Sequence, residues 1–227
     1  MKLYTPIFAS LLIAASVSSA WATNLPPSTS QVPATVPGFF GGTLINQATT
    51  HVFTPTFSGW ASTAVYENSS GFYDFYYQFS NDAGSTNGID RLTGFDYTGF
   101  NVDAFQTSAA FGIFQAGTND VDTVDRDSSG VIGLNFSPAT GGKILPGTSS
   151  YTSILRTDAT HYKLGAFGVI DGFTANAPGF APAVPEPETY AMMLLGVGLL
   201  ALVRRNKAKK TEARLWNDAP GESRLAN

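Results

Sequence analysis

The stretch Phe72-Tyr-Asp-Phe-Tyr-Tyr-Gln-Phe-Ser80 is a dense aromatic run with the alternation of a β-strand. Successive side chains of a strand point to opposite faces, so Phe75, Tyr77 and Phe79 share one face. We expect that face to lie in the hydrophobic core. The chain has no cysteine and therefore no disulfide. Its stability must come from packing, to which aromatic side chains contribute large buried areas.

Similar patterns extend on both sides of this run. Short stretches of Val, Ile, Thr, Phe and Tyr alternate with clusters of Gly, Asn, Asp and Ser, which predicts many short strands. Asn87-Gly88 and Ser129-Gly130 lie between apolar stretches and are predicted as hairpin turns. No amphipathic helix is predicted away from the chain ends. Strands are expected near Thr43–Asn46, His51–Phe57, Trp60–Glu67, Phe72–Ser80, Asp90–Tyr97, Ala110–Gln115, Val121–Asp125, Val131–Phe136, Ser150–Arg156 and Tyr162–Val169.

The predicted fold class is mainly β: an antiparallel β-sandwich or jelly-roll-like domain over residues 39–180, followed by one C-terminal transmembrane helix. Residues 23–38 are rich in Pro, Ser and Thr and are predicted to form a flexible or extended arm. Between Thr23 and Ala183 there are twelve acidic and five basic residues, a formal balance of −7. This acidic domain disfavours nucleic acid and anionic membrane surfaces as partners.

The N-terminal residues have the three-part pattern of a secretory signal peptide. Lys2 precedes an apolar run over residues 7–15, and small residues follow it. Ala20 and Ala22 fit the narrow pockets of a signal peptidase, which predicts a signal peptide over residues 1–22 and cleavage before Thr23. A permanent membrane anchor is the alternative, and the shortness of the apolar run disfavours it.

Three segments follow one another near the other end of the chain. Val184-Pro185-Glu186-Pro187 should stay extended, because two prolines oppose both helix and central strand. The apolar run over residues 190–203 is predicted as a transmembrane helix, although at about 1.5 Å per residue it reaches only about 21 Å, against about 30 Å of hydrocarbon. A soluble core helix is the alternative. The basic stop-transfer cluster after the run consists of Arg204, Arg205, Lys207, Lys209 and Lys210, and it predicts a cytoplasmic location for that side.

This order of Pro-Glu-Pro, apolar helix and basic cluster resembles the PEP-CTERM sorting domain of Gram-negative bacteria, also catalogued as the C-terminal domain of ice-binding proteins. The resemblance covers Val184 to about Lys207, within a sorting signal predicted over residues 181–207. It implies recognition by an exosortase, cleavage near Pro185-Glu186-Pro187, and an organism that makes exopolysaccharide. The family usually stops just after the basic cluster. Residues 208–227 are predicted to be a polar cytoplasmic tail, and Thr211 to Asn227 have no assigned role.

The segment from Asp120 to Gly130 is the strongest candidate for metal chemistry. Asp125, Asp127, Ser129 and Gly130 fall at positions 1, 3, 5 and 6 of a calcium loop. Position 12, however, holds Phe136 in place of a bidentate Glu, and no helices flank the segment. A solvated hairpin turn is therefore favoured over a calcium site, and no metal or other cofactor is assigned.

Catalytic motifs are absent from the sequence. His51 and His161 are the only histidines, and neither has a ligand or catalytic partner at a recognisable spacing. A carboxylate pair for glycoside hydrolysis could come from Glu67, Asp74, Asp90, Asp96 or Asp103, but their separation cannot be read from sequence. Tyr73, Tyr76, Tyr97 or Trp60 could stack on sugar rings if they lie on an outer face.

We therefore expect an exported, non-catalytic protein of the cell envelope or extracellular matrix, structural or adhesive in exopolysaccharide or biofilm. Its expected partners are the export machinery, an exosortase, the membrane through the C-terminal helix before processing, and exopolysaccharide. The first alternative is a carbohydrate-binding module. A secreted glycosidase is the less favoured one.

Overall fold

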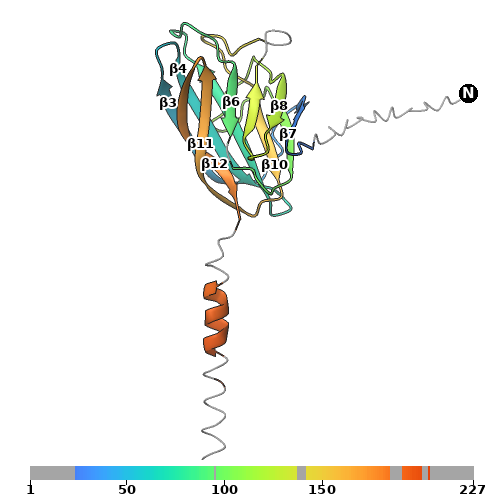
Figure 1. The fold of residues 1–227 in the computed structure, drawn as a ribbon. Coiled ribbons are helices and arrows are strands. Elements are labelled where there is room, and N and C mark those ends of the chain that lie inside the picture. Colours follow the sequence, from blue (N-terminus) through green and yellow to red (C-terminus); the bar gives the residue numbers. More distant parts are fainter. Residues whose placement is uncertain (1–23, 95, 137–141, 185–190, 201–203, 205–227) are drawn as a thin grey trace, which may run out of the picture. The chain divides into compact units, whose positions relative to one another are not determined.

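The computed structural model describes residues 24–94, 96–136, 142–184, 191–200 and 204. The chain divides into a compact β unit up to Ala183 and a second unit from Val184 onward. The β unit consists of two six-stranded sheets (Figure 1), which confirms the mainly β prediction. The predicted signal peptide, with Ala20, Ala22 and Thr23, lies outside the described residues.

We call the two sheets sheet I and sheet II. Sheet I has the order β2-β7-β10-β5-β4-β3, formed by Ala34–Thr35, Val102–Thr107, Thr152–Thr157, Tyr73–Asn81, Ser58–Glu67 and Thr43–Phe53. Sheet II has the order β1-β8-β9-β6-β11-β12, formed by Thr29–Gln31, Thr123–Arg126, Ile132–Asn135, Arg91–Gly94, His161–Asp171 and Phe173–Ala183. Neighbouring strands are antiparallel except β2 and β7, which are parallel.

The aromatic strand β5 packs into the main core as predicted. Phe75, Tyr77 and Phe79 are fully buried and belong to a hydrophobic cluster with side chains from sheet II, such as Leu92 and Phe167. Tyr77 also satisfies its hydroxyl inside the core, where the oxygen lies 2.8 Å from the hydroxyl of Tyr97 and donates to a backbone carbonyl. Period-two alternation therefore predicted the inward face correctly.

The outer face of β5 is buried too, which the alternation did not predict. Tyr76 lies in a second hydrophobic cluster outside sheet I, together with Phe105, Phe114 and Ile154. Phe39 stacks on Tyr76 with ring centroids 5.5 Å apart. Loop segments around Phe39 and Phe114 thus cover the middle of sheet I.

Several predicted elements are wrong in detail. The predicted strand over Ala110–Gln115 is a turn closed by an isolated bridge between Phe111 and Phe114, and it covers the outside of sheet I. The two strands predicted near Thr43–Asn46 and His51–Phe57 are one strand, β3, because an edge strand can carry polar residues on its solvent side and continue.

The two predicted hairpin turns have different outcomes. Ser129-Gly130 lies in the hairpin between β8 and β9, where Gly130 has a φ of 83° that glycine adopts readily. Asn87-Gly88 instead lies on the connection between β5 in sheet I and β6 in sheet II, so it joins no hairpin. Apolar stretches on both sides of a turn signal do not reveal whether the strands pair or face each other.

Four of the strands in the described part of the chain were not predicted. β1 and β2 lie within the Pro-rich arm, and each joins the edge of a different sheet. β7 is buried within sheet I, and β12 is an edge strand that contains Pro178 and Pro182. Proline is compatible with an edge strand because the missing N–H can face away from the neighbour.

A buried arginine links the arm to the sandwich. Arg126 in β8 is only 3% exposed and donates to the backbone carbonyls of Leu25, Tyr97 and Phe100. Burial lowers the pKa of its guanidinium from the ordinary value, while the charge of Asp158 opposes that shift. Three carbonyls from two separate segments therefore depend on one side chain.

Candidate functional site

The structure describes only part of the predicted sorting signal over residues 181–207. β12 ends at Ala183, and Val184 is exposed. Pro185, Glu186 and Pro187 lie outside the described residues, as do Arg205, Lys207, Lys209 and Lys210. Residues 191–200 are helical with exposed apolar side chains, and Arg204 is exposed as well. Within the described ranges, no helix has the length and apolar character needed to cross a membrane.

In the candidate calcium loop, other groups of the protein already bind the carboxylates of Asp125 and Asp127. Arg91 binds both oxygens of Asp125, at 2.6 and 2.8 Å, and the amide of Asn135 donates to one of them at 2.6 Å. Asp127 Oδ1 accepts hydrogen bonds from Ser129 N, Ser129 Oγ and Val131 N. This is the pattern of a side chain that closes its own turn. Among the described residues, no group of three or more acidic or histidine side chains could hold a metal ion.

The electrostatics of these two carboxylates follow from the same contacts. Burial alone would raise the pKa of Asp125, but hydrogen bonds from Arg91 and Asn135 outweigh it and lower the pKa. The hydroxyl of Ser129 and the N–H of Val131 lower the pKa of Asp127. Gly133 lies directly under the Arg91 guanidinium, where an added Cβ would fall 1.9 Å from Arg91 Nη2. The site is built around an arginine and its two hydrogen-bonding partners.

The two histidines have different partners. His51 Nε2 lies 2.8 Å from Asp82 Oδ2, and the Ser58 hydroxyl donates to the same oxygen at 2.6 Å. Because Ser58 bonds to the carboxylate and not to the imidazole, this set does not activate a serine nucleophile. His161 is exposed and lies 3.0 Å from the hydroxyl of Thr160 through its Nδ1.

One of the predicted sugar-stacking residues has the required exposure. Trp60 is 47% exposed on the outer face of sheet I, whereas Tyr76 and Tyr97 are buried and Tyr73 packs against Tyr162. His51 lies between Trp60 and Phe53, with ring centroids 4.6 and 4.3 Å from its own, and Phe53 is 74% exposed. We call His51, Phe53 and Trp60 the ring platform. Phe53 was missed because it was expected only as a strand residue.

The candidate carboxylates are dispersed. Asp90 pairs with Lys143 at 2.8 Å, and Asp96 pairs with Lys163 at 3.1 Å, both near the surface. Asp74 is fully buried, with Oδ2 3.3 Å from Arg156 Nε. Burial raises the pKa of Asp74, and the charge of Arg156 opposes this shift.

Glu67 and Asp103 line two adjoining hollows at one end of sheet I. The first has a volume of about 400 Å³ and is lined by Phe40, Gly41, Gly42, Thr43, Glu67, Asn68, Ser69 and Arg156. The second has a volume of about 320 Å³ and is lined by Asn68, Ser70, Phe72, Asn101, Asp103, Arg156, Thr157 and Asp158. Because Asn68 and Arg156 line both, we treat the pair as one groove and call it the Arg156 groove.

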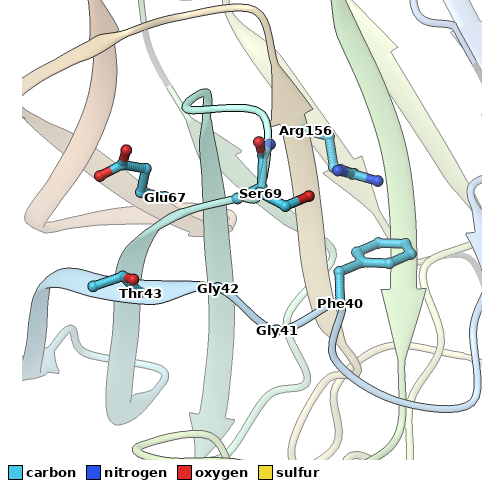
Figure 2. Close-up of a pocket in the computed structure, with 8 residues that line it drawn as sticks. Phe40, Gly41, Gly42, Thr43, Glu67, Ser69 and Arg156 are labelled. Atoms are coloured by element: carbon cyan, nitrogen blue, oxygen red, sulfur yellow. The ribbon is translucent and has the colours of Figure 1, made fainter.

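Figure 2 shows the first hollow, with Arg156 above the ring of Phe40 and Glu67 on the far side. The guanidinium carbon of Arg156 lies 4.8 Å from the centre of that ring. Arg156 and Asp103 are cross-strand neighbours on β10 and β7. Burial raises the pKa of Asp103, against the opposing effect of the Arg156 charge. No motif in the sequence marks this groove, since its residues come from four separate segments.

Comparison with known proteins identifies one segment. Residues 183–208 match the family model described as the PEP-CTERM protein-sorting motif. No curated protein and no solved structure matches the chain. The match begins at the last residue of β12 and covers the predicted Pro-Glu-Pro element, apolar run and most of the basic cluster. The chain therefore carries a PEP-CTERM sorting motif, which implies an exported protein that is processed by an exosortase.

Proposed function

We propose that this protein is a non-catalytic structural or adhesive component of the cell envelope or exopolysaccharide matrix, placed there by exosortase processing. The observation that carries the proposal is where the motif begins. β12 ends at Ala183 and the family match starts at residue 183, so cleavage near Pro185 would leave the twelve strands of the described residues in one polypeptide. An intact folded domain is what such a sorting system needs to deliver.

A non-catalytic role is supported by how the candidate acid groups are used. Asp74, Asp90, Asp96 and Asp125 each pair with a cation, and Asp82 accepts bonds from His51 and Ser58. Glu67 and Asp103 are separated laterally by the strands β5 and β10, which places their backbones about 14 Å apart at three strand spacings, and their side chains line different hollows. Glycosidases hold their two carboxyl groups about 5 to 9.5 Å apart.

An adhesive role is supported by the ring platform. Exposed aromatic side chains on a rigid sheet offer apolar contact area that loses little conformational entropy on binding. The same platform favours a carbohydrate-binding module as the second candidate, because Trp60 can stack on a sugar ring. The adhesive role and the carbohydrate-binding role both use the outer face of a sheet. Neither role requires the sandwich to make or break a covalent bond.

The proposal is tested by following the protein in its natural host, in an exosortase deletion strain, and in a strain without this gene. We expect the processed form in the envelope or matrix fraction of the first strain and the unprocessed form in the membranes of the second. The third strain should make a matrix that is mechanically weaker or adheres less. Normal matrix cohesion and adhesion without the gene would contradict the structural or adhesive role, whatever the processing result.

A further inference from the structure

The Arg156 groove has the composition of a ligand site. Its two hollows, of about 400 and 320 Å³, lie at the lower end of the range for pockets that hold small ligands, about 300 to 1,000 Å³. Phe40, 40% exposed, borders one hollow, and Phe72, 37% exposed, borders the other. Hydroxyl, amide and charged groups line the space between them.

Arg156 is held in place while its outer nitrogens stay available. Its Nε faces the buried carboxylate of Asp74, and its guanidinium lies over the Phe40 ring. Its Nη groups donate no hydrogen bond to any residue in the described part of the chain. Five N–H donors in a fixed plane can therefore present their remaining hydrogens to a ligand that enters the groove.

Acceptors lie next to these donors. Asp103 neighbours Arg156 across the strand pair, and its carboxylate accepts no hydrogen bond from another described residue. Asp158 is held by Asn101, whose backbone N–H and side-chain amide donate at 3.0 and 2.6 Å. A ligand with hydroxyl groups can accept from Arg156 and donate to Asp103, which a purely anionic or purely apolar ligand cannot do.

Charge decides the class of ligand. Glu67, Asp103 and Asp158 line the groove together with one cation, Arg156, whose charge is already opposed by Asp74. The groove therefore has a net negative charge. It would repel an anionic ligand, because like charges brought together at a binding site are unfavourable. The ring platform is a weaker candidate, because its neighbouring polar groups bond to one another: Ser58 and His51 to Asp82, and Ser80 to Ser149.

We propose that the Arg156 groove binds a neutral saccharide, with Arg156 and Asp103 on its hydroxyl groups and Phe40 against a sugar ring. The inference rests on the proposed matrix function and names its ligand class. Removing Arg156 would leave buried Asp74 without its cation, so folding itself would suffer. Asp103→Asn and Phe40→Ala are the better variants, because the first keeps the shape of the side chain and the second changes a half-exposed ring.

The test uses the full-length chain purified in detergent and titrated with neutral hexaoses of glucose, mannose and xylose, with hexagalacturonate as the acidic probe. We expect at least one neutral hexaose to bind and the acidic one to bind at least about tenfold more weakly. Asp103→Asn should raise the Kd about fivefold, since a hydrogen bond to a charged acceptor becomes a neutral one. Phe40→Ala should raise it by about fivefold as well.

Matched controls are Asp96→Asn and Phe173→Ala, which make the same changes on exposed residues outside the groove. No binding of any neutral hexaose, or tighter binding of hexagalacturonate, would overturn the inference. So would a Kd that responds to Trp60→Ala and not to the groove variants. None of these negative binding results would contradict the proposed matrix function, because that function is tested by matrix strength and adhesion in the gene deletion strain. Cleavage of a bound hexaose would support the groove and contradict the non-catalytic proposal.

Discussion

The sorting motif and the β-sandwich carry their chemistry in different ways. In the motif, three short segments follow one another within residues 183–208, and their order along the chain is the signal. In the sandwich, Asp74, Asp103 and Arg156 come from β5, β7 and β10 and meet only because these strands are neighbours in sheet I. A linear signal can be recognised without a fold, whereas a surface site exists only after folding.

The two regions are therefore vulnerable to different changes. A few substitutions in the motif should abolish sorting and leave the stability of the sandwich unchanged. A single core substitution should destabilise the sandwich and leave the recognition sequence intact.

The first prediction concerns the motif. Replacing Pro185, Glu186 and Pro187 together with alanine should block processing, because alanine lets helix extend toward the sandwich and removes the charged group that a protease could grip. Immunoblots of membrane and medium fractions should then show only full-length protein, with the melting temperature of the sandwich unchanged. Pro220→Ala with Glu222→Ala is the matched control in the polar tail. Wild-type processing of the triple variant would break the proposed separation.

The second prediction concerns the buried arginine. Arg126→Met should leave the carbonyls of Leu25, Tyr97 and Phe100 without a donor. Each buried carbonyl that stays unsatisfied lowers the free energy of unfolding by about 1 to 3 kcal/mol. We expect the free energy of unfolding to fall by about 3 kcal/mol or more, measured by urea denaturation. The exposed control Lys163→Met should cost less than about 1 kcal/mol. Equal effects of the two substitutions would show that the buried arginine is not a structural link.

The third prediction concerns Asp125, and it also tests the calcium hypothesis. Asp125→Asn should lower stability at neutral pH by about 1 to 2 kcal/mol, because it weakens the hydrogen bonds with Arg91 and Asn135. Since folding lowers the pKa of Asp125, the ionised carboxylate stabilises the fold above its unfolded pKa of about 3.9. That stability is lost as the pH falls through the lower folded pKa.

The wild type and the Asp125→Asn variant should therefore converge in stability at acid pH, which thermal melts across a pH series can show. Added calcium should leave both melting temperatures unchanged, because Arg91 and the turn at Asp127 already occupy the carboxylates. A large calcium-dependent rise that Asp125→Asn abolishes would establish the metal site that we disfavour.

These contrasts also explain how much the sequence could predict. The motif was predictable because each part has a local physical signature, and the inward face of β5 was predictable because alternation is local too. The burial of Tyr76 was not, because it depends on loops around Phe39 and Phe114 that fold over sheet I. The Arg156 groove was not predictable either, since strand order brings its residues together. No sequence signal marks Arg126 as a buried residue, and only the structure shows its carbonyl partners.

The last prediction concerns the ring platform, where the expected effect on stability is smallest. Phe53 is 74% exposed, so Phe53→Ser should change the free energy of unfolding by less than about 0.5 kcal/mol. Its ring is nevertheless in contact with His51, and its loss removes much of the exposed apolar area of the platform. If the platform is adhesive, the processed variant should be retained less well in the matrix fraction and appear in the medium. Phe173→Ser is the matched control, because Phe173 is also exposed but lies on β12 of sheet II. Equal retention of both variants and the wild type would exclude the platform as the adhesive surface. Loss of retention in Phe53→Ser alone, with unchanged stability and processing, would separate adhesion from both folding and sorting.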